Sequence, residues 1–156
     1  MAMREALMLM LLVSSGFVRN AVSADGVQYP EWIMEQVAWS FENKRYVKIE
    51  DFREALVKYN NEIDNPLSES LHQPLGMPAL IVKFDFAEET NDGLMSIKKF
   101  VRIEAKSGNL TALEVLYDLH NAIQHLFEDY DHKYFEGLEF ESGQDGVGNY
   151  IMFLGS

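Results

Sequence analysis

Regular alternation of apolar and polar side chains between residues 79 and 105 is the feature that most restricts the fold of this chain. In the first half of this stretch, alternate positions are apolar at Leu80, Val82, Phe84 and Phe86. In the second half the apolar positions include Ile97, Val101 and Ile103. A period of two is typical of half-buried strands, and the intervening Asn91-Asp92-Gly93 has the composition of a turn. We therefore expect a hairpin, with strands at about residues 79–86 and 95–105.

The residues after this hairpin predict a helix and a second pair of strands. Thr111 and Glu114 match a capping box, which begins a helix that ends near Asp129. Strands are expected at residues 133–140 and 149–154, with the glycines between them at positive φ in a hairpin turn. Strand pairs joined by short turns cannot make parallel crossovers. The expected class is α+β, with N-terminal helices followed by a ββαββ antiparallel sheet packed on helices.

The first half of the chain shows helical periodicity. After Pro30, residues 31–42 place apolar side chains on one helical face. A second helix is expected at residues 51–63, with Asp51 and Glu54 resembling a capping pair at its start.

The chain is expected to form one domain, because its length is typical of one and its hydrophobic content of 47% is sufficient for a core. The absence of cysteine excludes disulfides and thiolate metal sites. The predicted parts of this single domain, residues 1–156, are a helical half at 1–64, a proline-rich connector at 65–78 and the ββαββ half at 79–156.

The N-terminus allows two interpretations, which the sequence leaves open. Residues 6–13 are continuously apolar and lead to Val22-Ser23-Ala24, a small-residue pattern that signal peptidase accepts. Residues 1–24 are therefore a possible signal peptide of an exported protein, cleaved after Ala24. Glu5 and Arg19 disfavour cleavage, and the alternative is a buried N-terminal helix in a cytoplasmic protein. In either case the apolar run is too short to span a bilayer.

Trp32 and Trp39 lie seven residues apart, almost opposite the apolar stripe of the helix expected at residues 31–42. If the N-terminal helix stays in place, it covers both tryptophans. If residues 1–24 are removed, the two tryptophans become a candidate interface for a ligand or partner.

Acidic residues are concentrated in the last third of the chain. Residues 107–156 contain nine acids and one base, a net charge of −8 out of a total of −12. Such a field repels nucleic acid and anionic membranes, and it raises encounter rates with basic proteins. The partner class that we expect is therefore a basic protein.

The leading hypothesis is a small non-enzymatic binding protein, similar to an inhibitor or immunity protein, without a cofactor. Its acids act by steering and by charge-assisted hydrogen bonds, with two tyrosines as amphipathic anchors. The predicted binding residues are Glu128, Asp129, Tyr130, Asp131, Tyr134, Glu136, Glu139 and Glu141.

Catalytic and metal sites have weaker support in the sequence. The acids from Asp129 onward do not match a calcium loop, and His120 and His125 are turned too far apart on a helix to bind one metal ion. A dispersed hydrolase site at Asp118, His125 and Asp129 remains an alternative, so enzymatic activity stays open. His120 is expected at the edge of the core. Basic residues near Phe100 suggest binding of single-stranded nucleic acid, but the net negative charge opposes that function.

Overall fold

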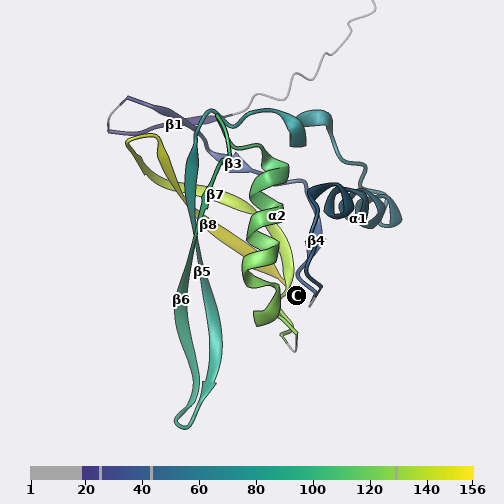
Figure 1. The fold of residues 1–156 in the computed structure, drawn as a ribbon. Coiled ribbons are helices and arrows are strands. Elements are labelled where there is room, and N and C mark those ends of the chain that lie inside the picture. The colour runs from purple at the N-terminus through teal and green to yellow at the C-terminus, as the bar shows by residue number, and fades with distance from the viewer. Residues whose placement is uncertain (1–18, 25, 43, 129) are drawn as a thin grey trace, which may run out of the picture.

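The computed structural model describes residues 19–24, 26–42, 44–128 and 130–156 (Figure 1). It confirms the α+β class. None of its helices is long and apolar enough to cross a bilayer, within the part of the chain described. The helical elements are α1 (Ile49–Glu62), η1 (Glu69–His72), α2 (Ala112–Ile123) and η2 (Gln124–Leu126). The strands are β1 (Asn20–Val22), β2 (Gln28–Pro30), β3 (Trp32–Ile33), β4 (Trp39–Ser40), β5 (Ala79–Thr90), β6 (Gly93–Glu104), β7 (Tyr134–Gln144) and β8 (Val147–Gly155).

The main sheet has the order β3-β7-β8-β5-β6, with β4 also paired to β7. Its two long hairpins, β5–β6 and β7–β8, confirm the strands expected after residue 78. The antiparallel expectation is wrong, because β5 and β8 pair in parallel from Ala79 with Val147 to Lys83 with Ile151. The ββαββ description also fails for the sheet as a whole, since β3 and β4 add strands from the N-terminal half.

Helix α2 packs on one face of this sheet (Figure 1). Its buried side chains, such as Leu116 and Leu119, share a core with Leu80 of β5, Leu138 of β7 and Tyr150 of β8. The predicted capping box is confirmed: the Thr111 hydroxyl accepts a hydrogen bond from the Glu114 N–H, and the Glu114 carboxylate accepts one from the Thr111 N–H. Full burial of each leucine stabilises the fold by roughly 1.5–3 kcal/mol.

The helix expected at residues 31–42 is wrong. Within the described residues, the expected helical half at 1–64 contains one α-helix, α1, and four short strands. Ile33, Val37 and Phe41 are buried as predicted, but from an irregular segment that contains β3 and β4. Hydrogen bonds to other elements replace those of a helix here. The Phe41 N–H donates to the Lys133 carbonyl, and the Phe140 N–H donates to the Glu31 carbonyl.

Asn60 of α1 holds the middle of this segment. Its Oδ1 accepts a hydrogen bond from the Ala38 N–H (3.0 Å), and its Nδ2 donates to the Ala38 carbonyl (2.7 Å). The same carboxamide also bonds to the Leu56 carbonyl and to Nδ2 of Asn65. Because Asn60 is fully buried, these bonds compensate for its desolvation.

Helix α1 is confirmed, but its start differs from the prediction. It begins at Ile49, two residues before the expected capping pair of Asp51 and Glu54, and its N-cap Lys48 makes no side-chain capping bond. Glu50 and Asp51 lie in the first turn, where their negative charges interact favourably with the helix dipole. The connector is irregular apart from η1, as its prolines predicted.

Glycines in the β7–β8 hairpin have two different roles. Asp145 and Gly146 both have positive φ, which is typical of a type I′ turn and confirms the turn prediction for Gly146. Gly143 and Gly148 do not have positive φ, and there the expectation is wrong. Gly143 instead leaves room for the ring of Tyr29, which also stacks on Phe140, and Gly148 leaves room for the ring of Tyr150.

We predict that Asn60→Ala lowers the free energy of unfolding by about 1–3 kcal/mol, because the Ala38 N–H and carbonyl lose their partners. Urea unfolding monitored by circular dichroism measures this change. Asn61→Ala, at an exposed position of the same helix, is the control and should change stability by no more than about 0.5 kcal/mol. Equal effects of the two substitutions would contradict the role given to Asn60.

We further predict that Gly143→Ala destabilises the protein by about 1–3 kcal/mol, because the new methyl group overlaps the buried Tyr29 ring. The measurement is a double-mutant cycle with Tyr29→Ala. In that background the ring is gone, so Gly143→Ala should have little further effect. An unchanged penalty in both backgrounds would show that Tyr29 is not the cause.

Candidate functional site

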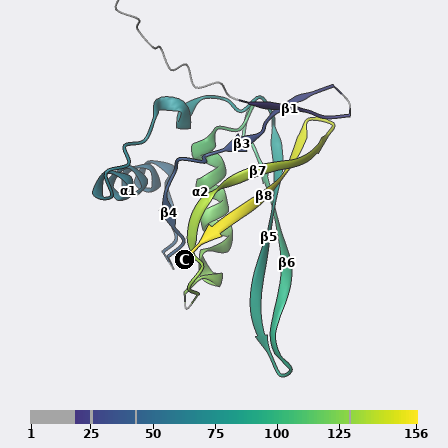
Figure 2. The ribbon, with the colours of Figure 1, turned by 180° about the vertical axis from the view of Figure 1, so that it is seen from behind.

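The face of the sheet opposite α2 carries one row of side chains that crosses five strands. Residues that are direct cross-strand neighbours point to the same side of a sheet. Seen from behind, β7 and β8 lie in front of α2, and no helix of the described chain crosses them (Figure 2). From β3 to β6 the row is Trp32, Glu139, Ile151, Lys83 and Phe100.

Two aromatic side chains lie together near the β3 edge of this face. The rings of Trp32 and Phe153 lie 5.6 Å apart at 37° to one another. Phe153 is 39% exposed, and Phe100 at the other end of the row is 60% exposed. Exposed aromatic groups on a rigid sheet are typical of contact surfaces, since Trp and Tyr supply most of the energy at many interfaces.

Two carboxylates lie next to the aromatic pair. Glu139 is the direct cross-strand neighbour of Trp32. The backbone of Glu35 passes over Gly137, which is the cross-strand partner of Phe153. A Cβ on Gly137 would lie 3.2 Å from Cα of Glu35, and φ of Gly137 is +134°. Glycine at 137 therefore allows the β3 segment to approach β7 this closely.

The acids of β7, and Glu35 beside this strand, differ in whether they form an ion pair. Lys83 forms an ion pair with Glu141 and so neutralises it. Glu35, Glu136 and Glu139 form no ion pair or side-chain hydrogen bond with another residue in the described ranges. Their charges are therefore available to a binding partner.

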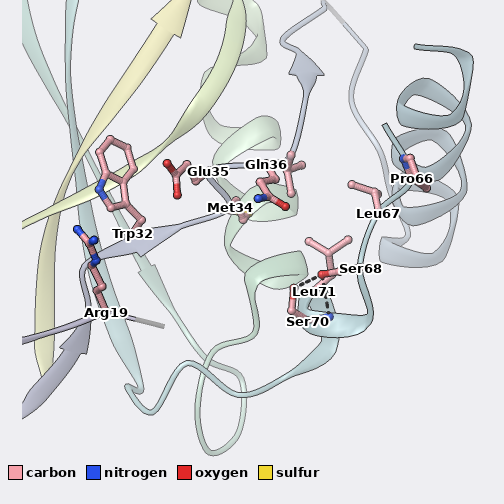
Figure 3. Close-up of a pocket in the computed structure, with 11 residues that line it drawn as sticks. Arg19, Trp32, Met34, Glu35, Gln36, Pro66, Leu67, Ser68, Ser70 and Leu71 are labelled. Carbon is pink, nitrogen blue, oxygen red and sulfur yellow. Dashed lines mark hydrogen bonds between the residues drawn. The ribbon is translucent and has the colours of Figure 1, made fainter. Parts of the chain in front are cut away.

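A groove of about 660 Å³ borders this face at Trp32. Arg19 and Glu35 line it together with Trp32, and the opposite wall includes Leu67 and Leu71 of the connector (Figure 3). The lining thus combines an indole ring, apolar side chains and one charge of each sign.

The other predicted binding residues separate into different environments. Tyr130 is not a free anchor, because its ring packs 4.9 Å from that of Phe86 and its hydroxyl accepts a hydrogen bond from the Ala87 N–H. Glu128 and Asp131 are exposed in the loop after α2, and Asp129 lies outside the described residues. Tyr134 is 41% exposed at the start of β7. Of the predicted set, Glu139 is the direct neighbour of Trp32.

The interface of two tryptophans, which is expected only for a chain without residues 1–24, does not include Trp39. Trp39 is only 6% exposed and packs against Tyr46, Phe52, Tyr59 and His120. These covering residues all follow residue 24, so they do not belong to the possible signal peptide. Residues 1–18 lie outside the described chain, while residues 20–22, which cleavage after Ala24 would remove, form β1.

His120 is a core residue, as expected, and it is completely buried. Its Nδ1 accepts a hydrogen bond from Nε1 of Trp39 (3.1 Å), so Nε2 carries the proton and donates to the Lys44 carbonyl (2.6 Å). Burial lowers the pKa of His120 because it disfavours the charged imidazolium, although the Lys44 carbonyl and Glu42 act in the opposite direction.

The described residues contain no cluster of three His, Asp or Glu side chains that could hold a metal ion. Asp118 is half-buried, and burial is the main cause of its raised pKa, with Glu114 adding to the effect and Lys106 opposing it. His125 is exposed in η2. The third member of the expected site, Asp129, lies outside the described residues.

We predict that stability decreases as the pH falls from 7.5 to 5.5, in part through His120. In the unfolded chain a histidine takes up a proton near pH 6.5, whereas the folded His120 has a lower pKa. The unfolded state therefore binds more protons below about pH 6.5, and one histidine contributes at most about 1.4 kcal/mol per pH unit.

Denaturant unfolding across this pH range measures the effect. His120→Gln should reduce the slope of stability against pH, while His125→Gln, at an exposed position, should retain it. An identical slope for His120→Gln and the unmodified protein would contradict the assignment.

Comparison with known protein families, curated proteins and solved structures found no match for this chain. The function must therefore be inferred from the sheet face opposite α2, which no described helix crosses and which we call the uncovered face. That face combines a partly exposed aromatic pair with carboxylates that have no partner in the described chain.

Proposed function

We propose that this chain is a small non-enzymatic binding protein, of the inhibitor or immunity kind, and that it engages a basic protein through the uncovered sheet face. The observation that carries the proposal is the Trp32–Phe153 pair beside Glu35 and Glu139. Aromatic groups at the centre of a surface and charges around them are the usual anatomy of a protein interface.

The two kinds of side chain have separate roles in this proposal. The aromatic pair supplies apolar area that leaves water on binding, which slows dissociation. The carboxylates and the net charge of −12 attract a basic partner and speed association, most strongly at low ionic strength. A basic partner also relieves repulsion among acids that have no cation of their own.

The sheet itself favours binding without rearrangement. Trp32, Glu139 and Ile151 are on three adjacent hydrogen-bonded strands, so their backbone positions are fixed before a partner arrives. Preorganisation of this kind reduces the entropy lost on association.

Capture of partners from a lysate of the native host, followed by kinetic measurements on the purified complex, tests the proposal. The double variant Glu35→Gln/Glu139→Gln should lower the association rate of a basic partner by about 3- to 10-fold at low salt and flatten its salt dependence. The matched control is Glu128→Gln/Asp131→Asn, which changes the net charge equally at exposed acids outside the cross-strand row.

Trp32→Ala should act mainly on dissociation, with a loss of affinity of about 30-fold, or about 2 kcal/mol. Circular dichroism and the melting temperature establish that each variant is folded. Equal kinetics for the two double variants, or an unaffected Trp32→Ala complex, would disprove binding through this face.

A further inference from the structure

We propose that the Trp32 ring with Glu35 and Glu139 recognises an arginine side chain of the partner, in preference to lysine. This inference rests on the proposed function and names the group that the face binds. The guanidinium of the arginine stacks on the indole ring, and its N–H groups donate to the two carboxylates.

The spacing of the sheet supports this arrangement. Direct cross-strand neighbours have Cβ atoms about 4.5–5.5 Å apart, so a flat group resting on Trp32 lies within reach of the Glu139 carboxylate. Glu35 lines the same groove as Trp32, which places a second carboxylate in the groove that the ring borders (Figure 3). Of the aromatic side chains, tryptophan interacts most favourably with a cation above its face.

The preference for arginine follows from the shape and hydration of the two cations. Guanidinium is planar, stacks on aromatic rings and donates two parallel hydrogen bonds to a carboxylate. The lysine ammonium is a compact and strongly hydrated charge that cannot stack in this way. A site made of an indole ring and carboxylates therefore discriminates between two side chains of equal charge.

Two basic side chains of the protein itself lie near the proposed arginine site, and they differ in whether their charge is neutralised. Lys83 lies in the same cross-strand row, but Glu141 neutralises it. Arg19 lines the groove beside Trp32 without a described ion pair, so its positive charge opposes the entry of another cation. Removal of the Arg19 charge should consequently strengthen arginine binding.

Titration of the full chain with two blocked peptides, acetyl-(Arg)4-amide and acetyl-(Lys)4-amide, tests the inference. Tryptophan fluorescence reports binding, since Trp32 is at the site and Trp39 is buried in the core. We expect the arginine peptide to bind at least about 5-fold more tightly than the lysine peptide. Trp32→Phe, which leaves Trp39 in place, should abolish the fluorescence change.

Single charge variants complete the design. Glu35→Gln and Glu139→Gln should each weaken binding of the arginine peptide by about 3-fold or more, Arg19→Gln should strengthen it, and Glu128→Gln should have no effect. Equal affinity for the two peptides, or insensitivity to Glu35→Gln and Glu139→Gln, would overturn the inference. The proposed function would survive that result if partner association still slowed in the Glu35→Gln/Glu139→Gln double variant.

Discussion

The arrangement of residues 32–40 depends on the hydrogen bonds of the Asn60 carboxamide. Those to both backbone groups of Ala38 imitate a short stretch of sheet between helix α1 and the segment from Trp32 to Ser40. This attachment fixes the segment between β3 and β4 as both strands pair along the edge of β7. With Ile33 buried in the core, the adjacent Trp32 is directed to the uncovered face. The candidate site thus depends on a side chain that belongs to helix α1 and not to the sheet.

Local signals explain what the sequence predicts correctly. Alternation in β5 and β6, the Thr111–Glu114 capping box and the Asp145-Gly146 turn are each encoded within a few residues, and each is present. The helix prediction for residues 31–42 fails for a physical reason. Ile33, Val37 and Phe41 have the four-residue spacing of a helical face, but they are buried because this segment packs against β7 and α1. The parallel pairing of β5 with β8 joins residues far apart in the chain, so no local pattern predicts it.

The same distinction applies to the candidate site. Glu139 and Glu141 stand out in the sequence as acids, but their separate states, one without a described ion pair and one neutralised by Lys83, depend on which strand lies beside them. Glu35 and Phe153 have no sequence signal that links them. The Glu35 backbone can pass over the cross-strand partner of Phe153 because Gly137 has no side chain, at a point where β7 carries a register shift between Phe135 and Gly137. Composition therefore predicts the chemistry of the surface, and tertiary packing decides its members.

The position of β8 has a consequence for how the protein is made. Strand β8 follows the other described strands in the sequence, yet it lies in the interior of the sheet, between β7 and β5. Until β8 has been synthesised, the β5–β6 hairpin and the β3–β7 pair have no strand to join them. During translation the nascent chain consequently exposes the facing edges of two incomplete sheets, and pairing of strands distant in sequence is intrinsically slow. Synthesis of β8 therefore closes the sheet and removes these edges in one step.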